Sequence, residues 1–238
     1  MKKILVIDNN IDLPHGSLDI VHRLEKQQAS FNSFQIKVCR GPDNAPAEYK
    51  EDWNAVIISG SKTRILDEAP WIEKQMQFIR DLYDKKTPTF GICYGEQLIV
   101  RSLLGKKYIG PAPIPEYGWI KIEKTFIANT DNFLSEVPEV FYSLSFHQDE
   151  VRNLPESFHI LAKSNDCSVQ AYEIKNYPFL GVQFHPEKAL EEADESLRKL
   201  KQRKPNMYIH HPDKGGVFYN EALGDAIFHS FLQKVYAP

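Results

Sequence analysis

Residues 88–97 read PTFGICYGEQ, and this stretch decides the fold. The segment 88–92 is short and mostly apolar, which is typical of a strand buried in a parallel sheet. An apolar stripe at helical spacing follows over 96–104 and predicts an amphipathic helix. A strand that turns sharply into a helix exposes the residue at the turn, which here is Cys93.

The same alternation of short apolar runs and amphipathic segments precedes this stretch. Strands are predicted at 4–7, 34–38 and 55–58, and helices at 17–26 and from Pro70 onward. Proline is favoured at the first position of a helix, because its missing N–H would have no partner there. Strands that alternate with helices favour right-handed βαβ units and a mainly parallel sheet.

The second half of the chain has a different pattern, with strand candidates close together in sequence. They lie at 119–122, 140–144, 159–162, 169–172 and 179–184, and a last helix is expected at 220–235. Residues 191–215 are polar and charged, with a basic run at 198–204, and are interpreted as an excursion. We therefore predict an α/β fold over a single domain, 1–238: a flavodoxin-like, mainly parallel sheet flanked by helices, with an added antiparallel layer in the C-terminal half.

Composition excludes several classes of protein. The 238 residues include 42% hydrophobic and 26% charged residues, and the net charge of -3 has no dominant like-charge block. Nucleic-acid binding is therefore not supported. The three cysteines form no CxxC pair, which argues against a disulfide framework or a zinc site. The apolar part of the N-terminal MKKILVIDNN is too short for a signal peptide, and no run approaches the roughly 20 apolar residues of a membrane span. We expect a cytoplasmic protein.

Cys93 is a candidate nucleophile. Gly91 and Gly95 flank it, and small residues there permit a tight turn with close backbone packing. The free N–H groups at the start of the following helix favour a thiolate over a thiol and are able to hold a developing oxyanion. A buried structural cysteine at a strand end is the alternative. The other two, Cys39 and Cys167, have no ligand spacing and are interpreted as structural thiols.

A second motif, GVQFHPE, occupies residues 181–187. His185 closes a predicted strand, and Glu187 follows two residues later on the same side. Glu187 is then placed to orient one ring nitrogen of His185 and leave the other facing a nucleophile, as in a Cys-His-acid triad. Alone, the tripeptide His-Pro-Glu is more often a loop with a capping acid. Together with the cysteine at the strand-to-helix turn, it forms a specific combination.

These two motifs resemble the class I glutamine amidotransferases, and the resemblance covers nearly the whole chain in matching order. It includes ISGS at 58–61, PWI at 70–72, EYGW at 116–119 and HQD at 147–149. The run of residues at the cysteine is most similar to the GMP-synthetase branch and its stand-alone relatives.

The resemblance implies the reaction and the roles of the site residues. Cys93 would attack the side-chain amide of glutamine, His185 would transfer the proton, and Glu187 would orient His185. The backbone N–H groups of Tyr94, Gly60 and Ser61 would stabilise the oxyanion. The glutamine pocket would be formed by Gln97, His147, Gln148 and Asp149. No cofactor and no metal are expected, and the ammonia would pass to a separate synthase.

Two departures from the family pattern leave other functions open. Gly60-Ser61-Lys62 stands where the family usually has Gly-Gly-Pro, so a positive φ at Ser61 would be strained and the loop is expected to be more mobile. Gln148 stands where the family has glycine. A stand-alone γ-glutamyl peptidase acting on glutathione-like peptides, or a catalytically silent partner-binding module, are the alternatives. His210 and His211 are interpreted as parts of a solvated loop.

Overall fold

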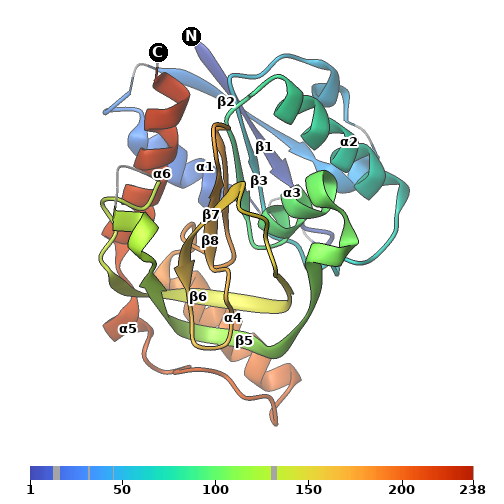
Figure 1. Ribbon diagram of the computed structural model, residues 1–238. Helices are drawn as coiled ribbons and strands as arrows, with labels where there is room; N and C mark the ends of the chain where they lie inside the picture. Colours follow the sequence, from blue (N-terminus) through green and yellow to red (C-terminus); the bar gives the residue numbers. More distant parts are fainter. Residues whose placement is uncertain (13–16, 32, 45, 130–132, 238) are drawn as a thin grey trace.

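The computed structural model describes residues 1–12, 17–31, 33–44, 46–129 and 133–237. Its strands form one nine-stranded sheet in the order β2-β1-β3-β4-β9-β8-β7-β5-β6. The first five strands of that order are parallel, and the other four join them in antiparallel fashion. The predicted fold class is confirmed, and the antiparallel strands extend the parallel sheet itself (Figure 1).

The parallel half holds the core of the molecule. Its strands are β1 (Lys2–Asp8), β2 (Phe34–Arg40), β3 (Ala55–Ile58), β4 (Thr89–Ile92) and β9 (Phe179–Val182). Every residue of β3, β4 and β9 is buried, as expected for central strands covered on both faces. Pro88, the predicted first strand residue, precedes β4 by one position.

The helices are α1 (Leu18–Gln27), α2 (Pro70–Asp84), α3 (Tyr94–Leu104), α4 (Leu190–Arg203), α5 (Gly215–Phe218) and α6 (Glu221–Tyr236). Of these, α1, α2, α3 and α6 cover the two faces of the parallel half. The apolar sides of α1 and α6 pack with Ile4 and Val6 in one cluster, whereas α2 and α3 pack with Leu5 and Ile7 in another. The alternation along β1 therefore separates two cores on opposite faces (Figure 1).

Two antiparallel strands, β5 and β6, are much longer than predicted. The four strands of this half are β5 (Ile109–Lys124), β6 (Val140–Val151), β7 (Phe158–Lys163) and β8 (Ala171–Ile174), and short 3-10 turns occur at Gly41–Asp43, Ala47–Lys50, Lys106–Tyr108 and Phe126–Asn129. The start of β5 escaped prediction because prolines interrupt it, and its register against β6 shifts between Pro111 and Glu116. The extension of β6 places His147, Gln148 and Asp149 on a strand.

The polar stretch 191–215 contains most of α4 and is fixed to the sheet. Ala193 and Leu197 of α4 pack against Trp119 and Leu144. The predicted solvated loop at His210 is wrong, because His210 N donates to Tyr117 O at 2.7 Å and its carbonyl accepts from Trp119 N at 3.0 Å. Between them, Gly118 has φ +112°, and a Cβ there would lie 2.1 Å from the His210 carbonyl oxygen.

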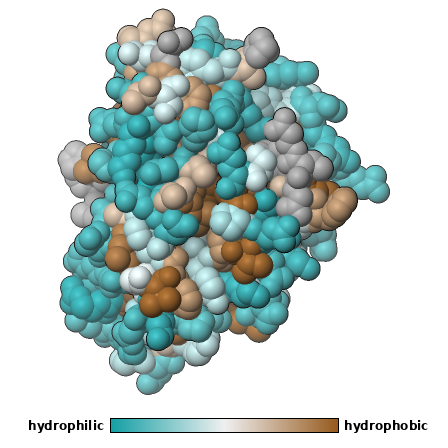
Figure 2. Space-filling view, turned by 90° about the vertical axis from the view of Figure 1, so that its left-hand side faces the viewer, coloured by the Kyte–Doolittle hydropathy of each residue, from teal (hydrophilic) through white to brown (hydrophobic). Residues whose placement is uncertain are grey.

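The outer surface shown in Figure 2 is mostly hydrophilic, with apolar side chains in small separate groups. Large apolar residues exposed on the chain include Phe126, Val140 and Val217. Scattered residues of this kind are ordinary on protein surfaces. Among the described residues, no helix has both the length and the apolar character that crossing a bilayer demands.

Candidate active site

Cys93 lies at the turn between β4 and α3, as the sequence predicts. It is the N-cap of α3, and its backbone adopts φ 52° and ψ −107°, a conformation that residues other than glycine rarely take. Its amide is fixed to the neighbouring strand, since Cys93 N donates to Val182 O at 2.8 Å. Backbone strain of this kind is concentrated at functional sites, where the surrounding structure holds it in place.

The two flanking glycines permit α3 to lie directly on the sheet. A Cβ at Gly91 would lie 2.6 Å from backbone atoms of Gly95 and Glu96, and a Cβ at Gly95 would lie 2.2 Å from the Ile58 carbonyl oxygen. Neither contact is possible for a larger residue without displacing backbone. The glycines therefore fix where the helix begins, and with it the position of the Cys93 side chain.

His185 and Glu187 follow β9 and form a close pair. His185 Nδ1 lies 2.7 Å from Glu187 Oε1, and both side chains are largely buried. Burial alone would lower the pKa of His185, but the negative charges of Glu187 and of a Cys93 thiolate outweigh it and raise the pKa to about 10. Burial opposes ionisation of Glu187 as well, yet the charge of His185 holds the pKa of that carboxyl below its usual range.

Gly60 lies against this pair. A Cβ added at Gly60 would be 3.0 Å from His185 Cε1 and 3.7 Å from Cys93 Cβ. The loop after β3, the turn after β4 and the segment after β9 therefore meet at one point. These are the carboxyl ends of three parallel strands, where open α/β sheets bind their ligands.

The loop that carries Gly60 and Ser61 is held by its neighbours. Ser61 Oγ donates to Asn9 O at 2.7 Å and accepts from Thr63 N at 3.0 Å. Ser61 does not adopt a positive φ, so the strain considered for a serine at this position does not arise. Lys62 forms an ion pair with Asp12. Tyr94, at the first position of α3, has a backbone N–H that no intrahelical carbonyl is placed to accept.

The predicted pocket residues differ in what their side chains contact. Gln97 Nε2 donates to Asp149 O and to Gln183 Oε1, both at 2.7 Å. His147 Nδ1 lies 3.1 Å from Asp149 O, and His147 Nε2 lies 2.7 Å from Glu116 Oε2. These buried side chains are thus bonded within the protein, whereas Gln148 is exposed.

The backbone of β6 lies beside the nucleophile. Cys93 Sγ is 3.8 Å from the carbonyl oxygen of Phe146, the residue directly before His147. Because Gln97 and His147 both bond to Asp149 O, they fix the same stretch of β6 that passes Cys93. The two side chains therefore determine the shape of the site through the strand that they hold.

Glu96 is a site residue that the sequence analysis did not single out. Its side chain is fully buried, and neither carboxyl oxygen has a hydrogen-bond partner among the described residues. Burial raises its pKa well above the usual value, and the nearby Cys93 and Glu150 add to the effect. Gly181 makes room for it, since a Cβ there would lie 2.7 Å from Glu96 Cγ. The signal in the sequence was an acidic residue at the start of a helix that was expected to be buried.

Comparison of the sequence with known proteins identifies one family. Residues 8–203 match the family model for glutamine amidotransferase class-I. The chain is 36% identical to one of the subunits of the glutamine-hydrolyzing GMP synthase of Methanocaldococcus jannaschii over 196 residues, which are 82% of this chain and 94% of that protein. It is also 37% identical to gamma-glutamyl peptidase 4 of Arabidopsis thaliana over 169 residues, 70% of this chain and 65% of that protein.

Solved structures share the fold over nearly the whole chain. A glutamine amidotransferase from Methylobacillus flagellatus superposes with a TM-score of 0.79 at 17% identity, covering 98% of this chain and 95% of that one. Another from Thermotoga maritima has a TM-score of 0.73 at 18% identity and covers 99% of both chains.

Proposed function

Because the chain belongs to the class I glutamine amidotransferases, we propose that it hydrolyses the side-chain amide of glutamine to glutamate and ammonia. Cys93 is the nucleophile, His185 the acid and base, and Glu187 the residue that orients His185. The observation that carries this proposal is the 2.7 Å contact between His185 Nδ1 and Glu187, in a site where Gly60 lies against both His185 and Cys93.

The reaction has two halves. In the first, Cys93 sulfur attacks the amide carbon, and the carbonyl electron pair moves to oxygen. The tetrahedral intermediate collapses as His185 gives a proton to nitrogen, so that the C–N bond breaks and ammonia leaves a γ-glutamyl thioester. In the second, water attacks the thioester while His185 accepts its proton. The C–S bond then breaks, and glutamate leaves the restored cysteine.

Two groups of donors stabilise the oxyanion in this proposal. The first is the N–H of Tyr94 at the positive end of α3, and the second is the Gly60–Ser61 turn after β3. The glutamine pocket is bordered by Gln97, His147, Gln148 and Asp149. The contacts above support a division among them: the buried members hold β6, and the exposed Gln148 is free to contact a ligand.

We propose that the ammonia passes to a separate synthase protein. The relative that supports this proposal is one of the subunits of a GMP synthase, and the chain spans nearly all of that relative's length. The nine-stranded sheet draws strands from 2–182, which supports treating 1–238 as a single domain. The three cysteines are free, as is typical of a reducing compartment, and support the cytoplasmic assignment.

A γ-glutamyl peptidase is the second candidate function. The similarity to a plant γ-glutamyl peptidase favours it, because the identity there is about equal to that with the GMP synthase relative. Cys93, His185 and Glu187 would catalyse the same two half-reactions, and the leaving group would be the amine of a peptide in place of ammonia.

The test is a comparison of substrates with the purified chain. Released glutamate is measured for glutamine, glutathione and other γ-glutamyl peptides, with Cys93→Ala as the inactive variant and Cys39→Ala as the matched control. Glutamine hydrolysis that disappears only with Cys93→Ala supports the amidotransferase. Faster release from glutathione than from glutamine supports the peptidase. Unchanged glutamate release by Cys93→Ala would contradict both.

A further inference from the structure

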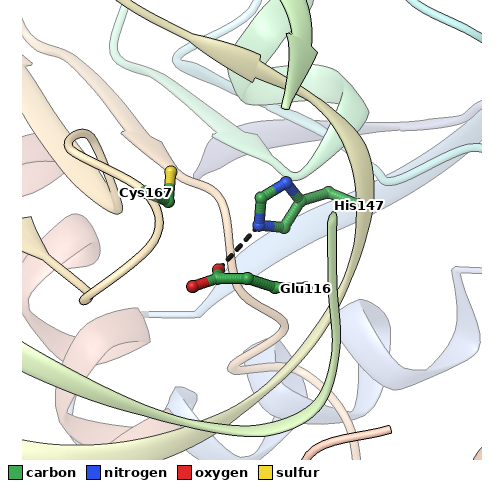
Figure 3. A group of neighbouring side chains, drawn as sticks. All are labelled: Glu116, His147 and Cys167. Carbon is green, nitrogen blue, oxygen red and sulfur yellow. Dashed lines mark hydrogen bonds and ion pairs between the residues drawn. The ribbon is translucent and has the colours of Figure 1, made fainter. Parts of the chain in front are cut away.

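A second group of reactive side chains lies buried beside the active site. Glu116 of β5, His147 of β6 and Cys167 before β8 each offer a ligand atom, and these atoms lie within 4.8 Å of one another. Figure 3 shows the three side chains converging from three segments of the chain, with the His147 ring directed at Glu116. The proposed hydrolysis uses neither Glu116 nor Cys167.

Both nitrogens of the His147 ring face oxygen acceptors. Nδ1 lies 3.1 Å from the Asp149 carbonyl, and Nε2 lies 2.7 Å from Glu116 Oε2. A carbonyl oxygen has no proton to give, so Nδ1 carries one. A second proton is then needed between Nε2 and the Glu116 carboxylate. An Nδ1–H bonded to a backbone carbonyl, with Nε2 facing a carboxylate and a thiol, is also the usual arrangement of a metal-binding histidine.

Carboxyl groups outnumber basic groups around this cluster. Glu96, Glu116 and Glu150 are all buried, and one oxygen of Glu150 and both of Glu96 have no partner among the described residues. The Cys167 side chain is also fully buried. Among the described hydrogen bonds, His147 is the one basic side chain that reaches any of these carboxyls.

We propose that Glu116, His147 and Cys167 bind a divalent zinc ion. The metal would replace two protons, one shared by His147 Nε2 and Glu116 and one on the Cys167 sulfur. The two positive charges gained equal the two lost, so the net charge of the buried site stays the same. A thiolate, an imidazole and a carboxylate together are ligands that zinc accepts in tetrahedral sites.

Neighbouring groups complete the site. Gln170 Nε2 donates to Glu116 Oε2 at 2.6 Å, and Ser164 Oγ donates to the other oxygen, so that the carboxylate is oriented from outside. Ser164 Oγ also accepts from Cys167 N at 3.0 Å. The Cys167 thiol donates to Val169 O at 3.4 Å, and the nearby Glu150 has one carboxyl oxygen without a partner among the described residues, which makes it the source of a fourth ligand.

This inference departs from the sequence-based expectation of no metal. The three ligands belong to segments 20 to 31 residues apart, as the spacing from 116 to 147 to 167 shows, so none of the short ligand motifs appears. Bound zinc would connect β5, β6 and the turn before β8 at the base of the active site.

The experiment uses the full chain carrying Cys93→Ala, so that zinc bound at the catalytic cysteine is not counted. The protein is expressed with added zinc, dialysed, and analysed for metal by mass spectrometry. We expect about one zinc per chain in this background, the same with Cys39→Ala added, and less than about a tenth with Cys167→Ala added. Circular dichroism checks that each variant is folded.

Three further measurements leave Glu116, His147 and Cys167 unchanged. Cobalt introduced during refolding should give a thiolate charge-transfer band and the intense visible bands of tetrahedral coordination. Zinc uptake by the metal-free protein in weak buffer should release about two protons per ion. Zinc at 100-fold above its dissociation constant should raise the melting temperature by about 5–10 °C.

Three results would overturn the proposal: no zinc in the Cys93→Ala protein, equal zinc after Cys167→Ala, or a cobalt spectrum without thiolate coordination. Glu116, His147 and Cys167 would then form a proton-bonded network only. None of these readouts depends on glutamine hydrolysis, so the outcome is independent of the proposed activity.

Discussion

Arg64 and Asp149, separated by 85 residues, form a two-point ion pair between the loop after β3 and strand β6. Arg64 Nε donates to Asp149 Oδ2 at 2.7 Å, and Arg64 Nη2 reaches Oδ1. Asp149 in turn accepts from Gln97 of α3 through its carbonyl oxygen. One residue therefore joins the loop after β3, strand β6 and the helix that follows Cys93.

Replacing Arg64 by Met should lower activity more than stability. The pair holds the loop that carries Gly60 and Ser61, so kcat/KM for glutamine should fall about 10- to 100-fold, somewhat less than the 10²–10³ typical of losing an oxyanion donor. The melting temperature should change little, because Arg64 is partly exposed. Steady-state kinetics and thermal unfolding measure the two. Lys62→Met, which removes the exposed pair with Asp12, is the control and should stay within about twofold. Equal losses in both variants would contradict the positioning role.

Glutamine turnover by the chain alone should be slow. The loop at Gly60–Lys62 lacks the rigid proline usual in the family, and a docked synthase would align its donors. We expect turnover well below the ordinary enzyme value of about 10 per second. Hydrolysis of glutamine at that rate without a partner would show that the loop is already aligned. Turnover should also be measured for Lys62→Pro. This substitution stiffens the loop that Ser61 and Lys62 anchor, so it should raise the rate of glutamine hydrolysis without a partner.

Glu187→Gln should move the alkaline limb of the pH profile to lower pH. In the native protein the pKa of His185 is raised to about 10, with the Glu187 charge as the largest favourable cause against the cost of burial. The imidazolium therefore persists up to that pH. Without the charge the pKa falls, the proton is lost earlier, and kcat/KM begins to decline nearer neutrality. Kinetics from pH 6 to about 11 test this. If the alkaline limb of the pH profile stays in place, it reports the titration of a group other than His185.

Glu96→Gln should stabilise the protein at high pH only. The pKa of Glu96 is raised in the folded state, so below its ordinary value of 4.5 both folded and unfolded forms hold the proton. Above that value the unfolded chain ionises and the folded one resists, so the native protein loses stability as pH rises. The uncharged side chain of Glu96→Gln does not ionise, so the variant does not lose stability in this way. The melting temperature should rise by several degrees, about 1–3 kcal/mol, at pH 8 and change little at pH 4.5. A rise of equal size at both values would point to packing.

Cys93 should react with iodoacetamide much faster than the other two thiols. Burial raises the pKa of Cys39 to about 12 and that of Cys167 further, which keeps both protonated at neutral pH. Cys93 lies instead at a helix N-terminus beside His185. Limited labelling at pH 7, followed by mass spectrometry, measures the order. Earlier modification of Cys39 or Cys167 would remove the argument for a selective nucleophile.

The parts of the site predicted from sequence are those encoded locally. The turn at Cys93 depends on neighbouring glycines, and the pairing of His185 with Glu187 depends on a two-residue spacing. Both are readable in a few consecutive residues. The contact between Arg64 and Asp149 is not, because it depends on how two distant segments meet in the folded chain.

Other features were hidden by conflicting local signals. Prolines at the start of β5 argue against a strand, yet they lie where the register with β6 is irregular. His210 stands in a polar stretch that favours a loop, and tertiary pairing with β5 overrides that preference. In each case the backbone hydrogen bonds come from a partner that composition alone does not identify.

The backbone conformation at Cys93 lowers the stability of the fold at the residue that the reaction requires. Its conformation suits glycine and costs about 1–3 kcal/mol for any other residue. Selection has to maintain the cysteine against that cost in every generation. A lineage that no longer needs the reaction should therefore drift to glycine at this position and gain a sturdier fold. Glycine there, in an otherwise similar chain, would be a mark of abandoned catalysis that a survey of genomes could recognise.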